Sequence, residues 1–191
     1  MLVGLNGPAG CGKDTLAELL VKEAGFTQYR FADPIKQMLE VFGIPLSVWE
    51  NHDLKEQPLE WLAHLGNTYR SPRYLAQTLG TEWGRNLVDE NIWHLLAKRK
   101  WDSLRHEPQR RMVISDVRFP NEAAWIKNAG GIILSISRPD SEHAMDNAKH
   151  LSEQGIPVVY VDGHIKNSGT RHDMYRKAAL VLNLNIRNTH D

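Results

Sequence analysis

The chain begins with residues whose types and spacing are suited to binding phosphate. Gly7, Gly12 and Lys13 match the pattern G-x-x-x-x-G-K, directly after the apolar residues 2–5. Glycines let successive backbone N–H groups converge on phosphate oxygens, because no Cβ blocks the approach. The lysine adds a mobile positive charge, and the helix expected after it points its positive dipole end at the same anion. The sequence therefore predicts a nucleotide-binding protein and favours phosphoryl transfer.

The residues that would meet a metal ion are less clearly marked. A Ser or Thr usually follows the lysine and binds magnesium, whereas this chain has Asp14 there and Thr15 one place later. Either Asp14 meets the metal, directly or through water, or Thr15 takes that place. A third candidate is Asp116, which follows the apolar or small residues 112–115, as the acid of a second nucleotide-binding strand does. Asp116 could instead be the N-cap of a nearby helix.

Charged residues also follow the strands expected at 27–32 and 112–116. Asp33 and Lys36 stand where a kinase faces its phosphate acceptor, so Lys36 would neutralise an incoming monophosphate. Their alternative is a helix start with Asp33 as the cap and Lys36 in solvent. Arg118 could bind a phosphate in a bidentate manner or form a surface ion pair with Glu122.

A polar helix face is expected in the middle of the chain. The helix predicted from residue 72 to about residue 87 carries polar side chains four positions apart, at Arg73, Gln77, Thr81 and Arg85. Such a face could bind a ligand or be covered by water alone. Gly80 inside this helix suggests a close approach of a backbone or a ligand. Trp93 could stack on a base or pack in the core.

The elements needed to position these residues alternate along the chain. Strands are predicted at 2–5, 27–32, 112–116, 132–137 and 157–161, and helices at 13–24, 34–42, 72–87, 91–104, 121–129 and 172–184. Strands that alternate with helices predict an α/β fold with a parallel sheet. With a phosphate loop after the first strand, this is a P-loop kinase-like three-layer sandwich with a parallel five-stranded sheet. Its ligands belong at the carboxyl ends of the strands.

One domain is expected over residues 1–191, with helices at 33–104 on the side of the phosphate acceptor. The polar residues 138–154 would form a lid. An arginine on such a lid, Arg138, could stabilise charge while the lid excludes water, although a plain surface loop explains it as well.

Composition narrows the possible partners. The 23 basic and 23 acidic residues balance, which argues against a duplex-binding surface. The single cysteine, Cys11, excludes an internal disulfide and a cysteine-based zinc site, and the nine histidines lack paired-ligand spacing. Neither a secretory segment nor an apolar run of eighteen residues is present. We expect a cytoplasmic protein with no nucleic-acid or membrane partner. The apolar face of the helix at 34–42 could pack in the core or form the interface of a homodimer.

Five motifs occur in a fixed order: Gly-Pro-Ala-Gly-Cys-Gly-Lys-Asp-Thr (7–15), Phe-Ala-Asp-Pro-Ile-Lys (31–36), Leu-Gly-Thr-Glu-Trp-Gly-Arg (79–85), Ser-Asp-Val-Arg-Phe-Pro-Asn-Glu (115–122) and His-Leu-Ser-Glu (150–153). Together they resemble the deoxynucleoside monophosphate kinases of tailed bacteriophages. The resemblance extends from Gly7 to about Asn167, and the Lys-Asp-Thr variant of the loop is similar to the form in that family.

The resemblance implies an enzyme that uses ATP and Mg²⁺ to convert a deoxynucleoside monophosphate to the diphosphate. The ATP site would comprise Gly7, Gly10, Cys11, Gly12, Lys13, Asp14 and Thr15, with Asn167 beside the adenine. The acceptor site would comprise Asp33, Lys36, Arg73, Gln77, Arg85 and Trp93. Asp116 and Arg118 would lie between the two phosphates, and Arg138 and Glu153 near the lid. For Asn167, a turn after the last strand is an equal explanation.

Two other functions remain in competition. A dephospho-coenzyme A kinase is similar in outline, and a regulatory module could bind ATP without turnover. Such a module would need the loop and Asp116 but no acceptor site. The Asp33/Lys36 and Gln77/Arg85 pairs therefore discriminate between a kinase and a regulatory ATP-binding module.

Overall fold

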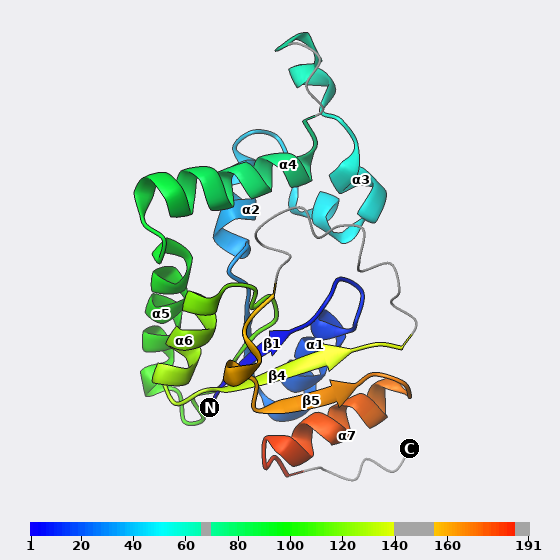
Figure 1. Cartoon of the computed structure of the whole chain (residues 1–191), viewed down its shortest axis with the longest axis vertical. Coiled ribbons are helices and arrows are strands. Elements are labelled where there is room, and N and C mark those ends of the chain that lie inside the picture. The colour runs from blue at the N-terminus through cyan, green and yellow to red at the C-terminus, as the bar shows by residue number, and fades with distance from the viewer. Residues whose placement is uncertain (66–69, 140–154, 186–191) are drawn as a thin grey trace. The chain divides into compact units, whose positions relative to one another are not determined.

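The computed structural model describes residues 1–65, 70–139 and 155–185 (Figure 1). The chain divides into two compact units. Unit 1 comprises Met1–Arg30 and Ala97–Asp191, and unit 2 comprises Phe31–Leu96. Within the described ranges, no helix is both long and apolar enough to cross a membrane.

Unit 1 is built on a parallel sheet. Its strands are β1 (Leu2–Asn6), β2 (Thr27–Tyr29), β3 (Met112–Ile114), β4 (Ile132–Ser137) and β5 (Gly163–Lys166). The order is β2-β3-β1-β4-β5, and every neighbouring pair is parallel. Central side chains such as Val3 and Val113 have no exposed surface. The predicted α/β fold with a parallel five-stranded sheet is confirmed.

Helices cover both faces of this sheet. On one face, α1 (Lys13–Ala24) and α7 (Arg171–Val181) share a buried cluster with the strands, through residues such as Leu16, Leu20 and Ala178. On the other face lies α6 (Pro120–Asn128), whose Ile126 packs against Gly4 of β1 so closely that a Cβ on Gly4 would lie 2.8 Å from it. Unit 1 therefore has three layers, and the carboxyl ends of its strands form one edge.

The last strand was misplaced by the sequence prediction, which put it at residues 157–161. Residues Val158–Tyr160 form the 3₁₀ turn η7 after Pro157, and the side chains of Val158 and Val159 are 74% and 81% exposed. The fifth strand is Gly163–Lys166, in which Ile165 is the buried residue. Asp162 begins its pairing with β4, since its N–H donates to the Ile133 carbonyl and its carboxylate accepts from the Ile133 N–H. An edge strand needs few buried side chains, so hydrophobicity pointed to the wrong segment.

Hydrogen bonds between Thr170 and Asp173 cap the start of α7. The Thr170 hydroxyl accepts a hydrogen bond from the Asp173 N–H, and the Asp173 carboxylate accepts from the Thr170 N–H and hydroxyl. These bonds hold the pKa of Asp173 below its ordinary value.

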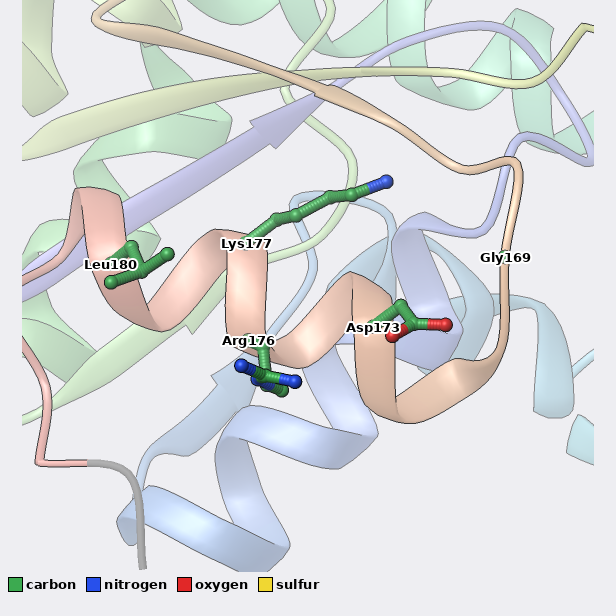
Figure 2. Close-up of a pocket in the computed structure, with 5 residues that line it drawn as sticks. All are labelled: Gly169, Asp173, Arg176, Lys177 and Leu180. Atoms are coloured by element: carbon green, nitrogen blue, oxygen red, sulfur yellow. The ribbon is translucent and has the colours of Figure 1, made fainter.

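An open hollow of 270 Å³ lies along α7, lined by Gly169, Asp173, Arg176, Lys177 and Leu180 (Figure 2).

Unit 2 is helical in the part that the structure describes. It contains α2 (Asp33–Glu40), the 3₁₀ turns η1 (Leu46–Glu50) and η2 (Glu60–Leu65), α3 (His52–Glu56), α4 (Pro72–Gln77), the π-helix η3 (Thr78–Val88) and the start of α5 (Ile92–Ser103). The single helix predicted over residues 72–87 is thus α-helical for its first six residues and a π-helix after that. Wider π turns rotate the residues of the predicted polar face relative to one another.

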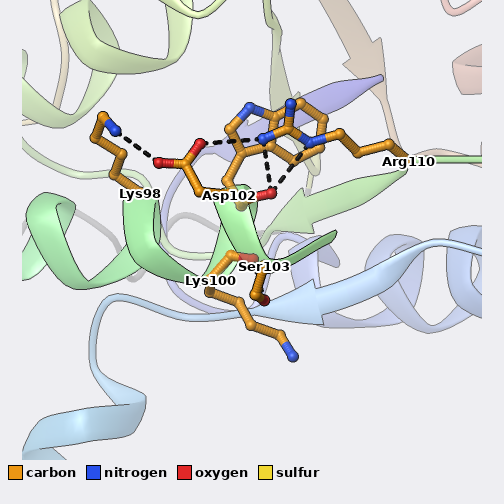
Figure 3. A network of polar contacts seen from close by, with 6 residues as sticks. Lys98, Lys100, Asp102, Ser103 and Arg110 are labelled. Atoms are coloured by element: carbon orange, nitrogen blue, oxygen red, sulfur yellow. Dashed lines mark hydrogen bonds and ion pairs between the residues drawn. The ribbon is translucent and has the colours of Figure 1, made fainter. Parts of the chain in front are cut away.

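A cluster of polar contacts joins the end of α5 to the segment before β3 (Figure 3). The Arg110 guanidinium lies 3.7 Å from the centroid of the Trp101 ring and donates to the Trp101 carbonyl through Nε and Nη2, at 3.0 and 2.7 Å. Asp102 accepts from Lys98 at 2.6 Å and from Arg110 at 3.3 Å. A short 3₁₀ turn, η4 (Leu104–His106), follows the helix. The cluster fixes the chain where it turns back toward the sheet.

This cluster predicts an acid-sensitive contribution to stability. The hydrogen bond from Lys98 holds the pKa of Asp102 below its ordinary value. A carboxyl with a depressed folded pKa stabilises the protein above its unfolded pKa, about 4, and this stabilisation is lost as the pH falls through the folded pKa. Asp102→Asn should therefore lower the midpoint of thermal unfolding at pH 7, and the difference from the native protein should shrink as the pH falls below about 4. Glu107→Gln, at an exposed position nearby, is the control. A difference that is constant with pH would contradict this prediction.

Candidate functional site

The loop between β1 and α1 has the geometry that its glycines predict. Gly7, Gly10 and Gly12 all have positive φ, at 143°, 73° and 106°. A Cβ at Gly7 would lie 2.2 Å from the Ile136 carbonyl oxygen, and one at Gly12 would lie 2.6 Å from the Asn167 Nδ2. Side chains would thus disrupt the loop at both positions. The first turn of α1 follows immediately, so its unpaired N–H groups lie at the same place.

Lys13 folds back over this loop. Its Nζ donates to the carbonyl oxygens of Gly7 and Pro8, both at 2.7 Å, and lies 3.8 Å from the Cys11 Sγ. Cys11 itself is fully buried. The ammonium group is thus held against the backbone that would bind phosphate.

Asp14 connects the loop to the neighbouring strands. Its Oδ1 accepts hydrogen bonds from the Ser115 hydroxyl at 3.0 Å and from Arg30 Nε at 3.3 Å. The Gln28 amide donates to the Ser115 hydroxyl at 3.2 Å. Thr15 is half-buried one place further along α1. Sequence reasoning missed Ser115, Arg30 and Gln28, although a serine between an apolar strand and Asp116 was a usable signal.

Asp116 and Arg118 follow β3 at the same edge of the sheet. The segment is fixed beside β1, because the Val117 N–H donates to the Leu5 carbonyl at 3.1 Å and the Asn6 amide donates to the Val117 carbonyl at 2.8 Å. Asp116 is half-buried and Arg118 is exposed. The alternative of Asp116 as a helix N-cap is wrong, since Phe119 is the N-cap of α6.

Glu122 of α6 is almost fully buried, with 2% of its surface exposed. Its carboxylate accepts hydrogen bonds from the backbone N–H groups of Arg118 and Phe119. Glu122 therefore holds the backbone at Arg118, rather than lying on the surface as the ion-pair alternative supposed.

Asn167 lies directly against the phosphate loop. Its amide donates to the Cys11 carbonyl at 2.9 Å, and its backbone N–H donates to the Ser137 carbonyl at 2.8 Å. Arg138 is exposed immediately after β4. The ends of β1, β3, β4 and β5 thus bring the predicted donor-side residues of unit 1 to one edge. Glu153 and the predicted lid from residue 140 onward lie outside the described residues.

Unit 2 carries the residues predicted for the acceptor. Asp33 is the first residue of α2, after the N-cap Ala32, so it is not the cap that the alternative interpretation proposed. The half-buried Lys36 places its Nζ 5.8 Å from the centroid of the Trp49 ring. Arg73 forms an ion pair with Glu56, and the Arg85 guanidinium donates a hydrogen bond to the Glu90 carbonyl at 3.0 Å. Gln77 is half-buried at the end of α4.

Trp93 is placed in the interior of unit 2, with 2% of its surface exposed. Its indole N–H donates to the Gly80 carbonyl at 2.7 Å, and a Cβ at Gly84 would lie 2.4 Å from its ring. At Gly80 the close neighbour is the Ile35 side chain, at 2.9 Å from a Cβ built there. The two glycines of the π-helix thus make room for core side chains, and Trp93 packs rather than presenting its ring to a base.

The oxygen donors Asp14, Thr15 and Asp116 are of the kind that magnesium prefers. Among the described residues, no group of three or more His, Cys, Asp and Glu side chains could hold a metal ion. Magnesium commonly binds through one or two carboxylates together with substrate phosphates, so the residues present fit such a shared site.

Comparisons with known proteins place the chain in a family. Residues 55–178 match the family model described as deoxynucleotide monophosphate kinase. A protein of Acanthamoeba polyphaga mimivirus, named for the same activity, is 36% identical over 73% of this chain and 75% of its own length. The deoxynucleoside-5′-monophosphate kinase of Escherichia phage T5 is 26% identical, with 87% of this chain and 89% of that protein aligned.

The fold is also similar to that of a solved kinase structure. Shikimate kinase from Aquifex aeolicus superposes with a TM-score of 0.55 over 96% of each chain, at 14% sequence identity, which bears on the fold alone. The family model covers more than half of the chain. This chain belongs to the deoxynucleotide monophosphate kinase family.

Proposed function

We propose that this protein transfers the γ-phosphate of ATP to a deoxynucleoside 5′-monophosphate, releasing ADP and the diphosphate. The observation that carries the proposal is the glycine loop with Lys13 folded over it, in a chain whose relatives are named for this activity. Nucleotide substrates of this kind are present in the cytoplasm, so the protein would act in the cytoplasm of the cell that makes it.

On the donor side, the backbone N–H groups of residues 7–13 would bind the ATP phosphates, and Lys13 would exchange loop carbonyls for phosphate oxygens. Asp14, Thr15 and Asp116 would hold magnesium, which, when bound, neutralises charge on the β- and γ-phosphates. Asn167, held to the loop by its amide, would border the adenine. Arg138 would stabilise charge from the segment after β4.

On the acceptor side, unit 2 would bind the monophosphate. Lys36 and Arg85 would neutralise its phosphate, with Asp33, Arg73 and Gln77 fixing its orientation. An oxygen of the acceptor phosphate attacks the γ-phosphorus, and the bond to the bridging oxygen of ADP breaks. No side chain acts as a covalent nucleophile, so the protein contributes positioning and charge stabilisation. Arg118 would offset repulsion between the two phosphates. Assigning residues 33–104 to the acceptor and residues 138–154, with Glu153, to a lid is part of this proposal.

The first experiment is ADP release from ATP and Mg²⁺ with each deoxynucleoside monophosphate in turn. Dephospho-coenzyme A and a mixture without acceptor are run in parallel. Turnover that depends on a deoxynucleotide supports the proposal and reports the base preference. Turnover with dephospho-coenzyme A alone, or tight ATP binding with no acceptor-dependent release, would refute it.

Acceptor-side variants should separate binding from chemistry. We expect Lys36→Ala and Arg85→Ala to raise the acceptor KM by about tenfold and to change kcat less, because each removes a charge that holds the ground-state monophosphate. Steady-state kinetics at saturating ATP measure both constants. Lys100→Ala, an exposed lysine of α5, is the charge-matched control. An unchanged KM in both variants would remove these residues from the site.

A further inference from the structure

Directly after the lysine of the phosphate loop, a carboxylate stands where a hydroxyl is usual, and a strand hydroxyl contacts it. In P-loop NTPases a loop Ser or Thr and a strand Asp hold the magnesium ion. Here Asp14, in the first turn of α1, supplies a carboxylate at that position, and the Ser115 hydroxyl just after β3 lies 3.0 Å from it. We propose that Ser115, oriented by Gln28, is a positioning residue that fixes the Asp14 carboxylate for the metal–nucleotide complex. This inference rests on the proposed function.

The hydrogen bonds can run in one direction only. An ionised carboxylate only accepts, so the Ser115 hydroxyl must donate its proton to Asp14. The Gln28 amide then donates to the oxygen of that hydroxyl, at 3.2 Å. Gln28 thereby keeps the hydroxyl proton directed at Asp14.

Ser115 is buried and held rigidly by the sheet, whereas the Asp14 carboxylate lies at the surface. Ser115 is 1% exposed, and its backbone N–H donates to the Tyr29 carbonyl of β2 at 3.3 Å. The Asp14 side chain is 65% exposed. A carboxylate in solvent would sample several rotamers, and a hydroxyl anchored in the sheet selects one of them.

The contacts of Asp14 also distinguish its two oxygens. The bonds from Ser115 and Arg30 both reach Oδ1. Within the described part of the chain, Oδ2 has no hydrogen-bond donor assigned to it. Oδ2 is therefore the oxygen available to a metal ion or to its bound water. Groups that orient a metal ligand in this way typically contribute 10–100-fold to metal affinity or activity.

The test is a double-mutant cycle that reports binding without turnover. Mn²⁺ replaces Mg²⁺, and electron paramagnetic resonance titration with ATP measures the affinity for the metal–nucleotide complex. The proteins are Ser115→Ala, Asp14→Asn and the double variant. Ser135→Ala on the neighbouring strand β4 is the matched control, since it removes a strand serine with no assigned link to Asp14.

Ser115→Ala should weaken Mn²⁺–ATP binding by about tenfold, and adding it to Asp14→Asn should weaken binding no further. Ser135→Ala should stay within about twofold of the native protein. Multiplying effects in the double variant, or no effect of Ser115→Ala, would overturn the inference. If Ser115→Ala does not fold, Gln28→Met keeps the hydroxyl and removes its orienting donor. It should weaken Mn²⁺–ATP binding by about threefold, and native affinity would overturn the inference.

Failure of this inference differs from failure of the proposed function. Deoxynucleotide-dependent turnover of the native protein tests the function and does not involve Ser115 variants. A coupled cycle in a protein without turnover would support the positioning role and refute the function. Turnover together with an uncoupled cycle would support the proposed function and refute the positioning role of Ser115.

Discussion

Lys13→Ala should lower kcat by about a thousandfold while the protein remains folded. The Lys13 ammonium lies 2.7 Å from the Gly7 and Pro8 carbonyl oxygens, so it is already at the backbone that would bind phosphate. Charge develops on the transferred group during the reaction, and removing a preorganised cation or donor there commonly costs 10²–10³-fold or more. Stability should change little, because α1 is held by the buried Leu16 and Leu20 rather than by this side chain.

The measurement is ADP release at saturating ATP and acceptor, with thermal unfolding of the same samples. Lys22→Ala is the matched control, since that lysine lies on the same helix with its side chain 80% exposed. A loss of less than about tenfold for Lys13→Ala would contradict the proposed charge stabilisation. A loss that is matched by unfolding would assign the effect to structure instead.

The phosphate loop and most of the sheet could be predicted because their signals are local. Gly7, Gly12 and Lys13 are close in sequence, and each central strand is an apolar run with buried faces on both sides. Asn167 was named only through the resemblance to a kinase family, and the topology explains its place beside the phosphate loop, since loops after parallel strands gather at one edge of a sheet. Its contact with the Cys11 carbonyl joins residues 156 positions apart, yet the topology alone brings them together.

The remaining features depend on contacts that a local pattern does not contain. The edge strand Gly163–Lys166 is less apolar than Val158–Tyr160, which turns outward, so hydrophobicity favoured the wrong segment. The π-helix places Gly84 directly against the Trp93 ring, a contact that lies outside any local pattern. Ser115 reaches Asp14 across 101 positions of sequence. In each case, tertiary contacts decided between local alternatives that the sequence pattern ranked incorrectly or did not raise.

Gly7→Ala should be the most damaging substitution in the loop for both stability and ATP binding. Gly7 has φ at 143°, a conformation that side-chain-bearing residues rarely adopt. Its Cβ would lie 2.2 Å from the Ile136 carbonyl oxygen and 2.9 Å from the Cys11 Sγ. Ile136 belongs to β4, which is paired with β1 and β5, so the backbone has little freedom to move away. Strain and overpacking together should cost about 3 kcal/mol or more, which lowers the unfolding midpoint by about 6–12 °C.

Gly10→Ala is the matched control, because it makes the same change three residues away in the same loop. Gly10 also has positive φ, at 73°, but a Cβ there would meet nothing within 4 Å. It should therefore cost only the left-handed backbone strain, about 1–2 kcal/mol of folding stability. Thermal unfolding and nucleotide titration of the two variants separate backbone strain from steric collision. Equal losses in both would show that φ alone limits the loop, whereas a much larger loss at Gly7 would show that its fit against β4 sets the shape of the phosphate site.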